Sequence, residues 1–218
     1  AWPVTRPQEI DEYSLQKVFA AANAIDTLIV GSGTEVALPA NAHSVHVDAR
    51  GLQPWREYFY RFRAEGALSQ TGRTHTTPEP GSMTPLAMAF ASCSQYEHGY
   101  FTAYRHLAEE RPHLILHLGD YQYEGKGTTN PAAPRVHAGS ETVTLEGYRL
   151  RHAQYKTDPD LQRLHAAAPW VVVWDDHEVE NNYAGEIAEA REKGEAPVTR
   201  EQFLARRAAA AAWAACAG

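Results

Sequence analysis

The sequence has few cysteines, no long apolar run and no excess of positive charge. Its two cysteines, Cys93 and Cys216, allow at most one disulfide, and the residues around Cys93 suggest a different role for it, so the redox compartment is not determined. No apolar stretch reaches the length of a membrane span, and no signal peptide is visible. The formal net charge of -7 argues against a general nucleic-acid or membrane-surface binder.

What remains is the composition of an ordinary globular protein. The chain has 218 residues, of which 44% are hydrophobic and 22% charged, and this length suits two modest domains. Proline and glycine in residues 78–82 suit neither a helix nor a strand interior, so this segment is a linker. We therefore expect a first domain at residues 1–80 and a second at residues 81–218.

The first domain has the pattern of short strands. We expect strands at residues 27–30, 35–38, 44–49 and 57–64, with a turn at the glycines of residues 31–33. The spacing of Leu52, Pro54 and Tyr58 resembles the tyrosine corner of fibronectin type III and immunoglobulin-like sandwiches. The expected fold of this domain is a small antiparallel β-sandwich.

Beyond the linker, strands alternate with helices. Residues 86–91 and 113–118 are apolar runs typical of parallel strands buried on both faces, and residues 99–110 between them have helical spacing. This is a βαβ unit, so its strands should be parallel with a right-handed crossover. The remaining expected elements are helices at residues 144–156, 159–167 and in the alanine-rich stretch to 215, and a buried strand at residues 170–174.

Unusual side chains follow each of the three apolar strands: Cys93, then Asp120 with Tyr123, then Asp176 with His177. Each has a plainer explanation by itself, such as a capping aspartate, a small buried thiol, a surface histidine or a solvated acidic loop. However, the carboxyl ends of parallel strands lie at one edge of a sheet, where ligands bind. The coincidence of the three strand ends therefore favours a metal centre.

The types of these side chains indicate particular metals and a particular reaction. Phenolate, thiolate and carboxylate together suit a ferric ion better than zinc, and oxygen ligands nearby suit calcium. Two cations can polarise a phosphoryl oxygen and lower the pKa of a bound water. An imidazole next to a metal ligand suits proton donation to the leaving oxygen.

At these residues the chain resembles the PhoD-like alkaline phosphatases and phosphodiesterases, within the calcineurin-like metallophosphoesterases. The similarity extends over about residues 42–207 and includes the β-domain that precedes the catalytic domain in this family. It implies an incomplete α/β metallophosphoesterase-type sandwich preceded by a small all-β fibronectin type III or immunoglobulin-like domain. The matching stretches are FASC at 90–93, EHGYFTAY at 97–104, LGDYQYE at 118–124, YRLRHAQY at 148–155 and WDDHEVENNY at 174–183.

The resemblance assigns metal ligands residue by residue. It implies that Cys93, Asp120 and Tyr123 hold Fe(III), and that Asp120 bridges to Ca(II), of which one or two ions are expected. Asp176 occupies the place of the asparagine ligand in the Gly-Asn-His-Glu motif of the wider superfamily.

The resemblance also implies the catalytic residues and the reaction. His177 falls at the position of the superfamily's acid, and Asn181 or Asn182 could contact metal or phosphate. The implied activity is hydrolysis of phosphate monoesters or diesters by metal-activated water or hydroxide, with a phospholipase D-type phosphodiesterase as a variant. The family is exported, which implies a secreted or periplasmic location.

The chain departs from the family at several places. Ser94 stands where the family has glutamine, and Gln122 stands where it has an aliphatic residue. No strand is recognisable before Thr27, and the chain ends before the part that carries further Asp and His ligands. We therefore expect half of the metal site here. The rest would come from a second chain or a longer sequence, or the protein is an inactive fragment that acts as a scaffold or binding module.

Overall fold

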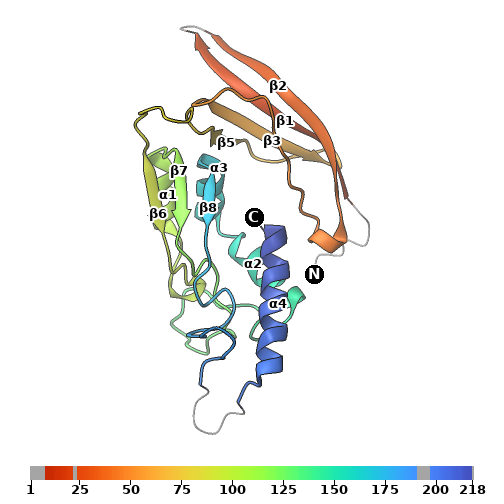
Figure 1. Ribbon diagram of the computed structural model, residues 1–218, viewed down its shortest axis with the longest axis vertical. Coiled ribbons are helices and arrows are strands. Elements are labelled where there is room, and N and C mark those ends of the chain that lie inside the picture. The colour runs from red at the N-terminus through yellow and green to blue at the C-terminus, as the bar shows by residue number, and fades with distance from the viewer. Residues whose placement is uncertain (1–7, 22–23, 191–196, 218) are drawn as a thin grey trace.

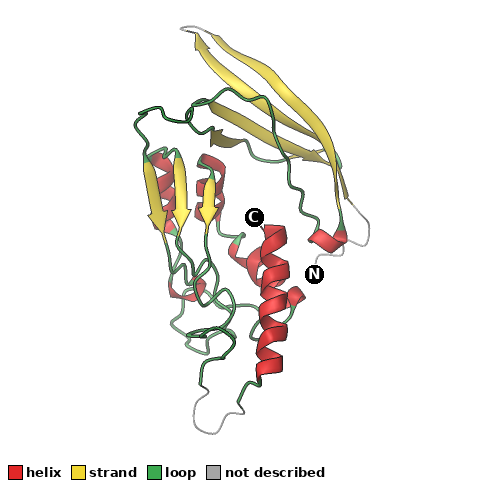
Figure 2. Cartoon of the chain, in the orientation of Figure 1, coloured by secondary structure: helices red, strands yellow, loops and turns green. Residues whose placement is uncertain are grey.

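The structure is a computed structural model that describes residues 8–21, 24–190 and 197–217. It contains an antiparallel sheet and a parallel sheet, and the α-helices accompany the parallel one (Figures 1 and 2). The strands are β1 (Gln8–Ala21), β2 (Ala24–Ala37), β3 (Glu57–Ala64), β4 (Ala67–Leu68), β5 (Gly72–His75), β6 (Met88–Ala91), β7 (Leu114–His117) and β8 (Trp170–Val172). The α-helices are α1 (Thr102–Glu109), α2 (Leu145–Tyr155), α3 (Pro159–Ala167) and α4 (Arg200–Ala217).

The first two strands are longer than the sequence pattern predicted. β1 lies before Thr27, where no strand was expected, and it pairs with β2 from Gln8 opposite Ala37 to Ala21 opposite Ala24. The expected turn at residues 31–33 is wrong, because these residues continue β2 and pair with β1. The register shifts beside them, and glycine inside a strand commonly marks such a bulge.

The strand expected at residues 44–49 does not form. Exposure nevertheless alternates there, since Val45 and Val47 are partly buried while His46 and Asp48 are exposed. The alternation correctly indicated which side chains face the protein. A strand also requires a neighbouring backbone to complete its hydrogen bonds, and the local pattern does not specify one.

β3 lies at the residues expected of it and carries the tyrosine-corner contact. The Tyr58 side chain is buried, and its hydroxyl accepts a hydrogen bond from the backbone N–H of Gln53 at 2.8 Å. The described strands around it form a single sheet in the order β2-β1-β3-β4, with β5 also paired to β3. The two-sheet sandwich that this motif indicated is therefore not confirmed.

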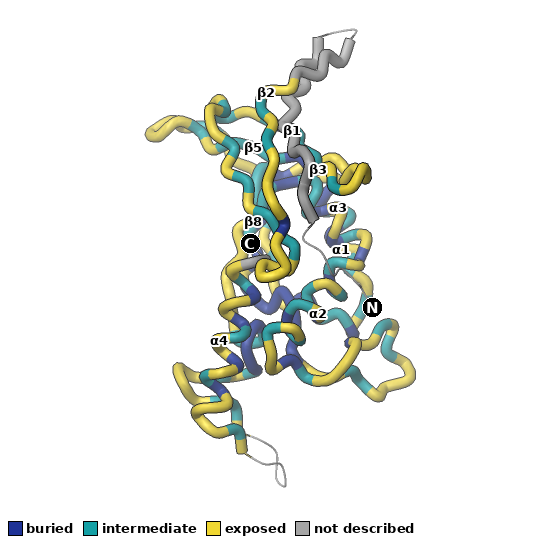
Figure 3. The backbone as a smooth tube through the Cα atoms, turned by 90° about the vertical axis from the view of Figure 1, so that its right-hand side faces the viewer, coloured by how far each residue is buried: buried dark blue, intermediate teal, exposed yellow. Residues whose placement is uncertain are grey.

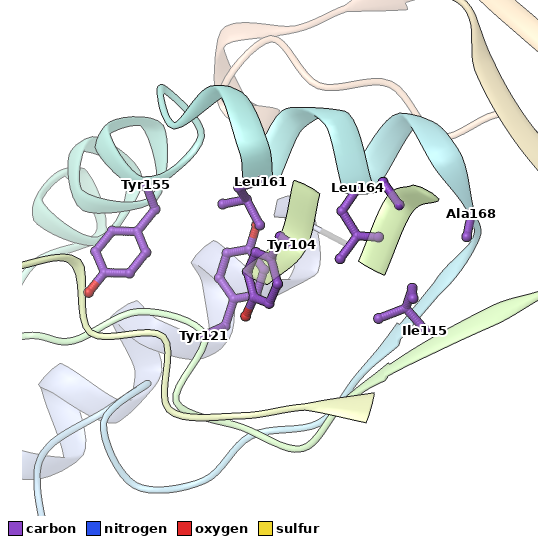
Figure 4. Packing of buried hydrophobic residues seen from close by; sticks show 8 residues of the cluster. Tyr104, Ile115, Tyr121, Tyr155, Leu161, Leu164 and Ala168 are labelled. Atoms are coloured by element: carbon purple, nitrogen blue, oxygen red, sulfur yellow. The ribbon is translucent and has the colours of Figure 1, made fainter. Parts of the chain in front are cut away.

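The second sheet has the order β6-β7-β8, and its strands are parallel as expected. Helices α1 and α3 cover one face, where Ile115 is completely buried among residues of both helices (Figure 4). Other residues of these strands are exposed: Phe90 is 74% exposed and Val171 is 53% exposed. Leu118, directly after β7, is 49% exposed. The prediction that these strands are buried on both faces is thus wrong, because among the described residues the helices cover only one.

The helices begin where the sequence provides caps. The Thr144 hydroxyl accepts a hydrogen bond from the backbone of Gly147 at the start of α2, and the Asp158 carboxylate accepts two at the start of α3. Buried residues are concentrated between α2 and α4, where Tyr148 packs with Phe203 and Trp213 (Figure 3). No helix in the described part of the chain has both the length and the apolar character needed to cross a membrane.

A buried arginine joins the two sheets. Arg73 on β5 donates hydrogen bonds to the carbonyl oxygens of Pro112, at 2.9 Å, and Ala167, at 2.8 Å. It also forms an ion pair with Glu57 on β3. Because Pro112 precedes β7 and Ala167 ends α3, this one side chain ties the antiparallel sheet to the domain that carries the strand-end residues.

Candidate metal centre

The ends of the three parallel strands meet as the sequence predicted. Beyond β6, the backbone N–H of Cys93 donates to the carbonyl of Gly119 at 3.2 Å, and that of Ser94 donates to Asp120 at 2.9 Å. Beyond β8, the backbone N–H of His177 faces the Asp120 carboxylate at 3.3 Å. Asp120 therefore lies at the middle of the site, in contact with both neighbouring segments.

Two of the expected ligand residues have an unusual backbone conformation. Cys93 has φ 58° and Asp120 has φ 54°, in the left-handed region that non-glycine residues seldom occupy. Such conformations cost free energy and persist only where the surrounding structure enforces them, which is common at functional sites.

Four of the predicted side chains make one cluster. Ligand atoms of Asp120, Asp176 and His177 all lie within 4.8 Å of one another. The Tyr123 hydroxyl donates a hydrogen bond to Asp120 at 3.0 Å. Two carboxylates, a phenol and an imidazole thus converge, and this donor set fits a hard metal ion.

The fifth predicted side chain, Cys93, joins this cluster through Tyr123. Burial, the negative charge of Asp120 and a side-chain hydrogen bond with Cys93 all raise the pKa of Tyr123. Without a cation, Tyr123 therefore remains a neutral phenol at physiological pH. Cys93 is an exposed free cysteine, whereas the side chain of Cys216 lies outside the described residues, so the disulfide alternative stays untested.

His177 is held by a carboxylate that the sequence analysis did not single out. Glu124 is buried, and one of its oxygens lies 2.8 Å from His177 Nδ1 while the other accepts the backbone N–H of Asn181 at 2.8 Å. Burial disfavours the charged imidazole, but the hydrogen bond and charge of Glu124 prevail and raise the pKa of His177. The His177 ring also lies against that of Tyr123, with 4.0 Å between centroids.

The two asparagines lie beside this cluster. The side-chain nitrogens of Asn181 and Asn182 both donate to the carboxylate of Glu189 at 2.8 Å. The backbone N–H of Asn182 donates to Asp176 at 2.5 Å, and this bond helps to lower the pKa of Asp176 against the effect of burial. The expected contact of the asparagine side chains with metal or phosphate stays a prediction.

Glu178 is the second residue that the sequence analysis missed. The segment 175–178 was open to interpretation as a solvated acidic loop, but Glu178 is only 1% exposed. Its carboxylate accepts the backbone N–H groups of Asp120 at 3.1 Å, Tyr121 at 2.5 Å and Asp175 at 2.9 Å. It therefore fastens the end of β7 to the segment after β8. The available signal in the sequence was that Glu178 directly precedes an apolar residue, Val179.

Gln122, one of the departures noted in the sequence, lies between two tyrosines of this segment. It is completely buried, and neither atom of its side-chain amide has a hydrogen-bond partner. We expect Gln122→Leu to stabilise the chain by about 1 kcal/mol, because a buried unpaired amide costs about 1–3 kcal/mol. Denaturant unfolding would measure this change, and a destabilisation above 1 kcal/mol would contradict it.

Comparisons with known proteins identify the family of this chain. The family model described as PhoD-like phosphatase matches residues 88–215, and that of the PhoD-like phosphatase N-terminal domain matches residues 2–78. Over 186 residues the chain is 53% identical to alkaline phosphatase D of Bacillus subtilis (strain 168), covering 84% of this chain and 31% of that protein. A solved structure titled "Structure of PhoD" matches with a TM-score of 0.84 and 46% identity, over 97% of this chain and 39% of that one. The chain thus spans about a third of its curated relative's length, and it belongs to the PhoD-like phosphatase family.

Proposed function

We propose that this chain contributes to the hydrolysis of phosphate monoesters or diesters at a centre that holds Fe(III) and one or two Ca(II) ions. The observation that carries the proposal is the convergence of Asp120, Asp176 and His177 within 4.8 Å. The name of the Bacillus subtilis relative, alkaline phosphatase D, supports the same class of reaction.

The donor atoms of the site support this choice of metals. The phenol of Tyr123 and the thiol of Cys93 are donors that suit Fe(III), and Asp120 has two carboxylate oxygens with which it could bridge to calcium. When bound, such a pair of cations would supply Lewis-acid activation of water and of the phosphoryl group.

The side chains around the cluster have separate roles in this proposal. His177, held by Glu124, would donate a proton to the leaving oxygen. A cavity of about 290 Å³ opens beside Cys93 and is lined by residues that include His98 and Tyr100. Because Cys93 lines this cavity, it would leave room for the organic part of a phosphate ester next to that proposed iron ligand.

The finer parts of the prediction belong to the same proposal. A phospholipase D-type diesterase is the variant substrate class, and a secreted or periplasmic location follows from the family. A fibronectin type III or immunoglobulin-like origin of the first domain is supported by the Tyr58 hydrogen bond. Further ligands would come from the remainder of a longer sequence or from a second chain.

Metal analysis together with turnover tests this proposal. The purified chain should hold iron, show a tyrosinate-to-iron absorption band, and hydrolyse p-nitrophenyl phosphate or its bis ester until a chelator removes the metal. Tyr123→Phe should abolish the band and weaken iron binding at least tenfold, about 1.4 kcal/mol. Tyr100→Phe is the matched control for the absorption band and for iron binding, because Tyr100 is an exposed phenol that is not a proposed iron ligand.

Each outcome has a distinct meaning. Loss of the band in Tyr123→Phe alone would support the assignment of the phenolate. A folded protein that binds no metal and has no turnover, both as this chain and within the longer sequence, would refute the enzymatic proposal and support the scaffold alternative. Iron binding that survives Tyr123→Phe unchanged would refute only the assignment of that ligand.

A further inference from the structure

A second cavity, of about 130 Å³, lies among α2, α3, α4 and the segment after β8. Apart from Glu178, which fastens the backbone of Asp120, none of its polar and aromatic side chains has a part in the proposed reaction. Helix α3 lies over Tyr121, which is one of the residues that line the cavity (Figure 4). The side chains that matter for its chemistry are Tyr121, His152, Lys156, His165, Trp174 and Trp213.

Lys156 places a cation in this cavity without an acidic partner. Its Nζ lies 2.8 Å from His165 Nε2 and 5.2 Å from the centroid of the Tyr121 ring. In the described part of the chain, these rings are its side-chain neighbours and no carboxylate pairs with it. Burial alone lowers the pKa of Lys156 to about 7, so at pH 6 the side chain is mostly charged.

The cavity also offers more hydrogen-bond donors than acceptors. His165 Nε2 lies 2.8 Å from both Lys156 Nζ and the Tyr121 hydroxyl, yet it has one position for a hydrogen bond. The indole N–H of Trp213, which can only donate, is buried without a partner, and so is Nδ1 of His152.

One carboxylate, that of Glu178, borders the cavity, and among the described residues it forms no ion pair with Lys156. Glu178 lines one edge, and its oxygens accept the three backbone N–H groups described above. The rest of the wall is apolar and includes Val172, Trp174 and Ala214. The cavity therefore combines a cation and unmatched donors with apolar surface.

We propose that this cavity binds a small carboxylate with an apolar body. The carboxylate would accept charge-assisted hydrogen bonds from Lys156 and a neighbouring donor, while its apolar part would lie against the tryptophans. A cavity of about 150 Å³ is known to hold benzene, so butyrate and benzoate are guests of suitable size. This site is independent of the proposed phosphoester hydrolysis.

Titration of the chain with sodium butyrate at pH 6 tests the proposal. Trp174 and Trp213 line the cavity, so binding should change tryptophan fluorescence saturably, and calorimetry should give the same dissociation constant. Lys156→Met should weaken binding at least about tenfold, because hydrogen bonds to charged groups contribute about 1.5–3 kcal/mol. The variant should fold, since it removes an unpaired buried cation.

Two controls make the result decisive. Lys126→Met removes an exposed lysine and should leave the affinity unchanged. Butyramide, which has no charge, should bind at least tenfold more weakly than butyrate, and this comparison needs no variant. The proposal is overturned if the unmodified chain shows no saturable binding, if butyramide binds as tightly, or if folded Lys156→Met retains the affinity.

Discussion

Replacing Glu178 by alanine is expected to destabilise the chain by about 3–5 kcal/mol, because two buried backbone N–H groups and a partly buried one lose their acceptor. The carboxylate is 1% exposed, so water cannot readily take its place. Urea or guanidinium unfolding would measure the loss. A change below about 1 kcal/mol would mean that these donors find other partners.

Glu178→Gln keeps the size of this side chain but replaces one of its two acceptor oxygens with a donor. The amide oxygen could keep the bonds from Asp120 and Asp175, whereas the amide nitrogen would face the N–H of Tyr121, donor against donor. Glu97→Gln is the matched control, because a single oxygen of Glu97 accepts the backbone N–H groups of Thr128 and His137, both at 2.8 Å. We expect Glu178→Gln to be the more damaging of the two.

The consequence for the metal centre follows from what Glu178 joins. It holds the backbone of Asp120 and the segment that carries Asp176, so its loss should also weaken metal binding. Iron and calcium content of the folded Glu178→Gln variant would show this effect. Metal binding equal to that of the Glu97→Gln variant would indicate that the strand ends stay in place without Glu178.

Gly119→Ala is the second large effect, with an expected destabilisation of about 2–4 kcal/mol. Gly119 has φ 102°, which side chains of L-residues rarely adopt. A Cβ atom there would lie 2.5 Å from both the backbone nitrogen and the Cβ of Asp175. Because both atoms belong to the main chain of the neighbouring segment or are fixed to it, the strand ends would have to separate.

Alanine substitutions at two other glycines distinguish the cost of backbone strain from the cost of the contact with Asp175. Gly139→Ala combines φ 79° with open space, so it measures backbone strain alone, which is about 1–2 kcal/mol. Gly125→Ala meets no atom within 4 Å and has no positive φ, and it should change stability by less than about 0.5 kcal/mol. If Gly119→Ala costs no more than Gly139→Ala, the contact with Asp175 is not rigid.

The second domain could be predicted well from the sequence because its signals are local. Pro112 stops the helix before it, Asp158 and Pro159 start α3, and a short apolar run marks each strand. The expected elements accordingly lie within a few residues of β6, α1, β7, α2, α3, β8 and α4. The first sheet was harder to predict, because the pairing between β1 and β2 includes register shifts. The alternation of apolar and polar residues along a single strand does not reveal such shifts.

The sequence by itself determined which chemical groups follow the parallel strands: a thiol, a phenol, carboxylates and an imidazole. Their convergence followed from the geometry of parallel strands, which share one edge. Only the tertiary structure decided that Glu124 orients His177 and that Glu178 fastens Asp120 beside Asp175. The physical reason is that a buried carboxylate takes its role from the donors it meets, and His177 for Glu124 and Asp120 for Glu178 lie more than fifty residues away along the chain.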